Sequence, residues 1–179
     1  MDEIETLDSK IVYQNKWMRV REDRIRRPSG AEGIYGVVDK PDFVAILPIQ
    51  DNHIHIVGQY RYPVKAWSWE IPQGAWESRP DADHAVLAAG ELREETGLIA
   101  KSLTYVGHLH QANGYSSQIC HVYLATDFER TERQLDEEEE GLVTKCVSLV
   151  EFERMIASGE LKDADTISVY GLAKLKGLI

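Results

Sequence analysis

Residues 90–98 read GELREETGL, and this stretch carries the most information in the chain. Apolar residues recur at three- and four-residue spacing just before it, which predicts an amphipathic helix over 81–96. On that helix Glu91 and Glu95 lie four residues apart and share one face, and Glu94 flanks the same face. Such crowding costs a helix about 0.2–0.5 kcal/mol per pair. The pattern indicates either a solvated acidic face or a site for a hard divalent cation.

The charge of the whole chain bears on that choice. The 179 residues include 20 Lys and Arg against 30 Asp and Glu, a net charge of −10 with neutral histidines. This balance argues against nucleic-acid binding, which needs clustered basic residues. An acidic protein that acts on an anionic substrate needs a bridging cation or a local basic patch. The composition therefore agrees with a cation on the acidic helix face.

The length predicts one domain with a small N-terminal extension. No apolar run approaches the ~20 residues that span a bilayer, and the first ten residues lack the apolar core of a signal peptide. We therefore expect a cytoplasmic chain without membrane contact. Cys120 and Cys146 lie in apolar stretches and are expected to be buried free thiols. His108, His110 and His121 alternate with apolar residues and are interpreted as strand histidines rather than a zinc site.

Alternation and turn residues divide the rest of the chain into mostly short strands. The expected strands are 10–26, 33–38, 43–48, 53–60, 67–71, 103–110, 118–126 and 143–148. The first two are expected to form an N-terminal hairpin. Two further helices are expected, one opened by a capping box at Ser148 and one capped by Asp163 or Asp165. Many strands with few helices predict a mixed α/β fold with helices packed on a sheet.

GELREETGL, with Gly74 upstream, resembles the signature of the Nudix hydrolases, G-x5-E-x7-R-E-U-x-E-E-x-G-U, where U is apolar. The second half matches at its spacing. The first half departs: the loop from Gly74 to Glu91 is two residues longer, Gly90 stands where the signature has Arg, and the early Glu is missing. Asp81 and Asp83 are the candidates to replace that Glu.

The resemblance covers nearly the whole chain. The segments NKWMRVREDRI, FVAILPI, QYRYP, WSWEIPQG and IASGELKDADTISVYGLAKL resemble the branch of ADP-ribose pyrophosphatases and nucleoside-diphosphate-sugar hydrolases. This implies an α/β/α sandwich on a mixed sheet with an N-terminal β-hairpin extension. It also implies a homodimer, with residues 1–40 as an N-terminal β extension at the interface and 41–179 as the Nudix hydrolase domain.

The resemblance assigns roles to individual residues. Glu91, Glu94 and Glu95 would bind Mg²⁺, with Mn²⁺ able to substitute, and Gln73 would add its backbone carbonyl. Arg61 matches an arginine that contacts the diphosphate, although a surface arginine is the plain alternative.

Three other positions have weaker assignments. Glu70 matches an acid near the site, and structural pairing with a neighbour is nearly as good an interpretation. Trp17 is a candidate to stack on a base, although core packing is favoured for a tryptophan in a strand. Ser116 lies in a loop that is near the substrate in relatives, where Gln118 replaces an acid.

The acidic run DEEEE at 136–140 would ordinarily be a solvated loop. In relatives a glutamate of this loop acts as the catalytic base, and Glu140 or Glu138 fits its position best. The implied reaction is metal-dependent hydrolysis of the pyrophosphate bond of nucleoside diphosphate sugars. The first choice is ADP-ribose, giving AMP and ribose 5-phosphate, with GDP-mannose or other nucleotide sugars also accepted. The alternatives are a non-catalytic nucleotide-sugar sensing module and a Nudix hydrolase of dinucleoside polyphosphates.

Overall fold

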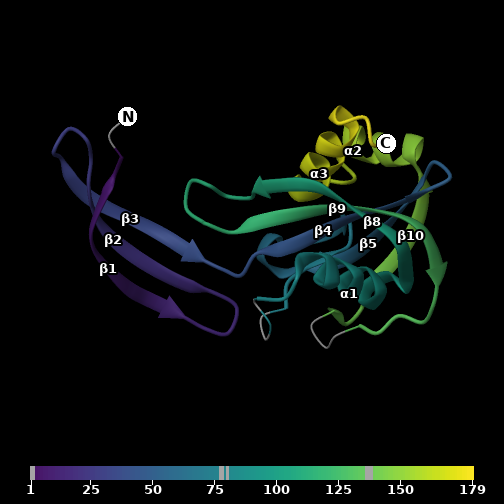
Figure 1. Ribbon diagram of the computed structural model, residues 1–179, viewed down its shortest axis with the longest axis horizontal. Helices are drawn as coiled ribbons and strands as arrows, with labels where there is room; N and C mark the ends of the chain where they lie inside the picture. The colour runs from purple at the N-terminus through teal and green to yellow at the C-terminus, as the bar shows by residue number, and fades with distance from the viewer. Residues whose placement is uncertain (1–2, 77–78, 80, 136–138) are drawn as a thin grey trace.

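The computed structural model describes residues 3–76, 79, 81–135 and 139–179. Figure 1 shows a layered core and a separate N-terminal sheet. The strands of the core sheet are β4 (Phe43–Gln50), β5 (His53–Arg61), β6 (Ala66–Glu70), β7 (Gln73–Gly74), β8 (Leu98–His110), β9 (Ile119–Arg130) and β10 (Val143–Ser148). They run in the order β10-β5-β4-β9-β8, with β6 beside β5 and β7 beside β4. Only β4 and β9 pair in parallel, so the sheet is mixed, as predicted.

Helices cover both faces of this sheet (Figure 1). Helix α1 (His84–Thr96) packs Leu87 and Leu92 against Val44 on one face. Helices α2 (Leu149–Ser158) and α3 (Ala164–Leu175) pack on the other face, where Phe152 meets a second core cluster. The side chains of β4 alternate between the two clusters, as strand geometry requires. The α/β/α sandwich is therefore confirmed.

Side-chain caps fix the helix ends. Ser148 accepts from the Glu151 N–H, which confirms it as the N-cap of α2, while the Glu151 carboxylate accepts from Arg154. Asp163, not Asp165, caps α3 by accepting from Thr166. Asp83 caps α1 by accepting from two backbone N–H groups, so this carboxylate is occupied in starting the helix.

The N-terminal sheet has one strand more than the predicted hairpin. Its strands are β1 (Glu5–Gln14), β2 (Arg19–Arg26) and β3 (Glu32–Asp39), all antiparallel. The single strand expected over 10–26 is wrong because Asn15 breaks it: its side-chain oxygen accepts from the N–H groups of Trp17 and Met18, both at 2.9 Å. The sheet is tied to the core where the Val38 N–H donates to the Tyr115 carbonyl at 2.7 Å.

The two cysteines differ in exposure. Cys120 is buried, whereas Cys146 is exposed on β10, so the prediction that both thiols are buried is wrong for Cys146. Strand β10 lies at the edge of the sheet, so among the described residues it has a neighbouring strand on one side only. Among the described residues, none of the helices combines the length and apolarity needed to cross a bilayer.

Candidate active site

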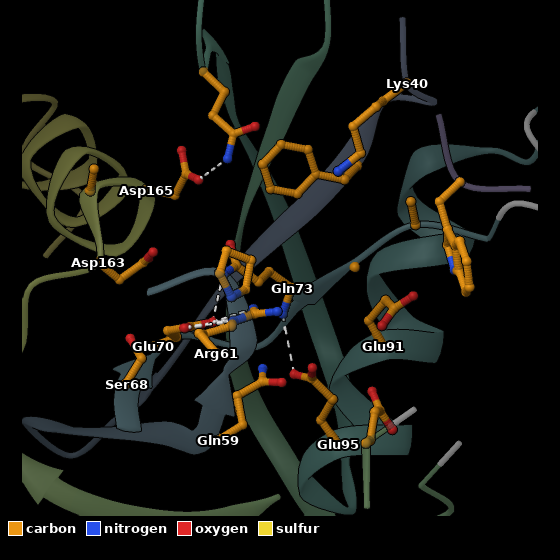
Figure 2. A pocket seen from close by; sticks show the side chains of 18 of the residues that line it. Lys40, Gln59, Arg61, Ser68, Glu70, Gln73, Glu91, Glu95, Asp163 and Asp165 are labelled. Atoms are coloured by element: carbon orange, nitrogen blue, oxygen red, sulfur yellow. Dashed lines mark hydrogen bonds and ion pairs between the residues drawn. The ribbon is translucent and has the colours of Figure 1, made fainter. Parts of the chain in front are cut away.

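A pocket of about 1340 Å³ lies where the core sheet splits. Strand β4 pairs with β5 only through its last two residues, and β7 pairs with the beginning of β4 instead. The pocket wall combines α1, β6, β7, the start of α3 and the turn between β1 and β2. Figure 2 shows polar side chains from these elements converging on one space.

Three carboxylates gather at the α1 side of the pocket. Oxygens of Glu91, Glu95 and Glu139 all lie within 4.8 Å of one another. Glu91 and Glu95 are 5% and 2% exposed, and Glu139 is half-buried in the loop before β10. Burial, followed by the charges of Glu91 and Glu139, raises the pKa of Glu95 well above its ordinary value. Buried like charges at this distance fit a divalent cation, which would neutralise them.

The backbone of β7 lies directly against these acids. A Cβ on Gly74 would stand 2.3 Å from the Glu91 carboxylate, so glycine is required for this close approach. The Gln73 N–H donates to Glu95 Oε2 at 3.2 Å. The side-chain oxygen of Gln73 is buried without a hydrogen-bond partner among the described residues, which leaves an acceptor at the site. The predicted metal role of the Gln73 carbonyl stays a prediction.

Arg61, Glu70 and Gln73 form a second polar group beside the carboxylates (Figure 2). Arg61 Nε donates to Glu70 Oε1 at 2.8 Å, and Gln73 Nε2 donates to Glu70 Oε2 at 3.0 Å. The hydrogen bonds to Glu70 raise the pKa of Arg61. Glu70 is 1% exposed, whereas 41% of the Arg61 side chain is accessible. Glu70 therefore pairs with a neighbour, which is one of the two interpretations that the sequence left open. Its partner is Arg61, and the bonds fix the guanidinium at the pocket.

Trp17 lies on the rim of the same pocket. It is 39% exposed, in the turn between β1 and β2, and the Lys16 ammonium stands 4.2 Å from its ring centre. The interpretation of Trp17 as a core residue is therefore wrong. The turn at Asn15 takes it out of the alternating strand pattern on which that interpretation rested.

Comparison with known proteins agrees with this geometry. A family model described as the NUDIX domain matches residues 40–168. The chain belongs to the Nudix family. A second model, the nucleoside diphosphate sugar hydrolase N-terminal domain, matches residues 4–38, in the three-stranded sheet. The Nudix chain is therefore a pyrophosphohydrolase of the branch that the sequence resembles.

Individual relatives extend over most of the Nudix chain. It is 30% identical over 177 residues to an ADP-ribose pyrophosphatase of Bacillus subtilis (strain 168), covering 97% of this chain and 94% of the relative. It is 31% identical over 168 residues to an ADP-ribose pyrophosphatase of Mycobacterium tuberculosis (strain ATCC 25618 / H37Rv), covering 93% and 81%. A crystal structure titled ADP compounds hydrolase has the same fold, with a TM-score of 0.87 at 22% identity, covering 99% of this chain and 97% of that one.

Some predicted Nudix site residues lie apart from the carboxylate group. Glu94 is half-buried on α1 but is neither in the group nor in the pocket wall. Glu140 is exposed and is likewise outside both, and Glu138 lies outside the described residues. Ser116 donates to the Val38 carbonyl at 2.8 Å, so it fastens β3 to the core rather than lining the pocket. Ligand roles for these residues stay predictions.

Sequence reasoning missed Glu139, which reaches the group; of the 136–140 run the structure describes only this residue and Glu140. An uninterrupted run of acids gives no periodic signal that distinguishes its members. It also did not explain Gln118, whose side-chain amide donates to the Pro41 carbonyl at 2.7 Å. A carboxylate cannot donate this bond, so an amide suits this position of the Nudix chain better than the acid of relatives.

The place of the missing signature arginine is occupied. A Cβ on Gly90 would stand 2.3 Å from the Trp76 ring, so the indole packs directly on the backbone of α1. The Arg79 guanidinium carbon lies 3.8 Å from the centre of the same ring. Trp76 also lines the pocket. Gly90 therefore has no room for a side chain, because the Trp76 indole fills the space where a Cβ would stand.

Proposed function

We propose that this protein hydrolyses the pyrophosphate bond of nucleoside diphosphate sugars, and that ADP-ribose, cleaved to AMP and ribose 5-phosphate, is its preferred substrate. The observation that carries the proposal is the group of Glu91, Glu95 and Glu139 in the pocket wall. A module that only senses a ligand has no need for three crowded acids, among which the pKa of Glu95 is raised. The carboxylates therefore favour turnover over sensing.

Glu91, Glu95 and Glu139 would hold Mg²⁺, or Mn²⁺ in its place. A bound ion of this kind neutralises phosphate oxygens and acidifies water. Glu139 is on a loop rather than on α1, so we assign it, in place of Glu138 or Glu140, to accept the proton of the attacking water. Glu91 and Glu95 are held by the helix and by the β7 backbone, so they keep the site in place during the reaction.

Arg61 supplies positive charge beside the carboxylate group. Its bonds to Glu70 use Nε and Nη2, so the planar guanidinium is fixed while Nη1 still carries two N–H donors. A fixed fork of donors suits paired phosphate oxygens. Trp17 lines the pocket with 39% of its surface accessible, and an indole at this place can stack on a base. Stacking tolerates different bases, so a second nucleotide such as GDP-mannose is also expected to be accepted.

The first test compares kcat/KM for ADP-ribose, GDP-mannose and a dinucleoside polyphosphate at one Mg²⁺ concentration. We expect ADP-ribose to lead and EDTA to abolish turnover of all three. Mn²⁺ is expected to restore the activity of the chelated enzyme. A tenfold preference for the polyphosphate, about 1.4 kcal/mol in transition-state binding, would assign the protein to another branch. Undiminished hydrolysis in EDTA would contradict the role of the carboxylates.

We also propose a homodimer formed through residues 1–40. Apolar side chains are exposed on the two outer strands of the N-terminal sheet, among them Ile11 (52%) and Tyr13 (54%) on β1 and Ile34 (63%) on β3. Covering them against a second copy would remove a large apolar surface from water. We expect sedimentation equilibrium at micromolar concentration to give the dimer mass, and Ile34→Lys to shift the protein toward monomer. A purely monomeric wild type would refute this proposal.

A further inference from the structure

Two histidines and an aspartate meet outside the pocket. Asp42 precedes β4, His84 is the first residue of α1 and His121 is on β9. One ligand atom from each of the three lies within 4.8 Å of the other two. The two imidazole rings stack with their centres 3.6 Å apart, and Asp42 Oδ2 lies 3.3 Å from His121 Nε2. One ring has to turn about its side-chain bonds for both to direct a nitrogen lone pair at the same ion. All three side chains are half-buried.

The framework of the fold holds these side chains in place. Asp42 Oδ1 accepts from the Ile119 N–H at 3.0 Å, which turns Oδ2 toward His121. His121 is in register with Val44 of the parallel strand β4, on the face that α1 covers. His84 follows the capping residue of α1, so its position is set by the helix start. The cluster therefore lies on α1, β9 and the residue next to β4, whose backbone positions are fixed by the fold.

The chemistry of this cluster differs from that of the pocket. Its three members are absent from the pocket wall, and the pocket group consists of carboxylates alone. Hard Mg²⁺ prefers oxygen ligands, whereas imidazole suits Zn²⁺ and other transition-metal ions. Two imidazoles and one carboxylate also match the three-ligand set of zinc sites that keep a water in the fourth position.

We propose that Asp42, His84 and His121 form a second metal site, which takes Zn²⁺ or a similar transition-metal ion with water as the fourth ligand. His108 offers no ligand atom to this group, so water is assigned to the fourth position. The interpretation of His121 as a plain strand histidine is replaced by this assignment. His108 and His110 are still interpreted as strand histidines, since neither belongs to the cluster.

A cation here would tie the start of α1 to β4 and β9. Glu91 follows His84 by two helical turns on the same helix. The second site would therefore fix the helix that carries two of the pocket carboxylates. It would do so whatever substrate the pocket takes, so this proposal stands independently of the proposed function.

Binding of Zn²⁺ and Co²⁺ to the metal-stripped full chain tests the proposal, with excess Mg²⁺ present to occupy the carboxylates. Calorimetry should show one Zn²⁺ per chain, and Co²⁺ should give the visible absorption of a low-coordinate, nitrogen-ligated ion. His84→Ala and His121→Ala should each weaken Zn²⁺ binding by at least about tenfold, since loss of even an orienting neighbour costs about 10–100-fold. Asp42→Asn, which keeps the shape of the side chain, should weaken it in the same direction.

Two control variants separate this site from its surroundings. His53→Ala removes an exposed histidine that bonds only locally to the Asp51 carbonyl, and it should bind Zn²⁺ like the wild type. Glu95→Gln should lose activity yet keep the Zn²⁺ site, so failure of the proposed function and failure of this proposal are distinguishable. Zn²⁺ binding that survives in His84→Ala and His121→Ala, or that disappears in Glu95→Gln, would overturn the second site. Circular dichroism of each variant confirms that it is folded.

Discussion

Glu95→Gln is expected to lower kcat/KM at saturating Mg²⁺ by about 10³-fold, roughly 4 kcal/mol of transition-state stabilisation. The amide keeps the shape of the side chain but removes one of three charges that lie within 4.8 Å of one another, and it turns N–H donors toward the cation. Steady-state kinetics with ADP-ribose measures the loss.

The same substitution should stabilise the metal-free protein. The pKa of Glu95 is raised in the folded state, so ionisation of this group opposes folding above the ordinary pKa of a glutamate. The sign follows from proton binding: between the ordinary and the raised pKa the folded chain holds more protons than the unfolded chain, and stability falls as pH rises. Removing the charge removes that loss, so thermal unfolding at neutral pH in EDTA should move to higher temperature.

Glu94→Gln is the matched control, on the same helix and one residue away. Because Glu94 lies outside the carboxylate group, we expect less than a tenfold effect on kcat/KM. An equally large loss in Glu94→Gln would show that Glu94 is a ligand, as the family signature implies. A metal-free Glu95→Gln protein that unfolds at lower temperature than the wild type would contradict the electrostatic argument.

Gly90→Arg, which restores the arginine of the family signature, is expected to destabilise the protein by about 1–3 kcal/mol and to lower kcat. The cause is Trp76, whose ring stands 2.3 Å from the position of the new Cβ. Displacing the indole would also disturb the pocket wall, which it lines. Denaturant unfolding and steady-state kinetics measure the two effects.

Gly90→Ala in two backgrounds provides a sharper comparison. Alanine gains about 1 kcal/mol of helix propensity over glycine, but it meets Trp76. We expect the substitution to destabilise the wild type and to stabilise the Trp76→Ala variant. If Gly90→Ala changed the free energy of unfolding equally in both backgrounds, the Trp76 indole would not be what excludes a side chain at position 90.

The sequence predicted the layered core well because its elements are locally encoded. The capping box at Ser148 and the periodicity around Leu92 depend only on neighbouring residues, and both helices formed where expected. The strand expected over 10–26 is wrong because the Asn15 turn replaces two positions of an otherwise regular alternation. One side chain decided that local structure.

The site was predicted only in part, for a different reason. The helical spacing of Glu91 and Glu95 places them together from sequence alone, and their burial confirms that they face the core side of α1. The contribution of Glu139 depends on the path of a long loop, and that of Trp76 depends on a contact with the backbone of Gly90. The meeting of His84 with Asp42 and His121 joins three distant segments. Tertiary contacts of this kind leave no short-range signal.

The separation of the N-terminal sheet from the core has a consequence for how such enzymes diversify. Trp17 lies in the turn between β1 and β2 of this sheet, whereas the carboxylates lie on α1 and in the loop before β10. Figure 1 shows the sheet apart from the layered core. The two segments are matched by different family models, over 4–38 and 40–168. If Trp17 stacks on the base as proposed, changes in the first segment would alter which nucleotide is recognised and would leave the carboxylate group unchanged.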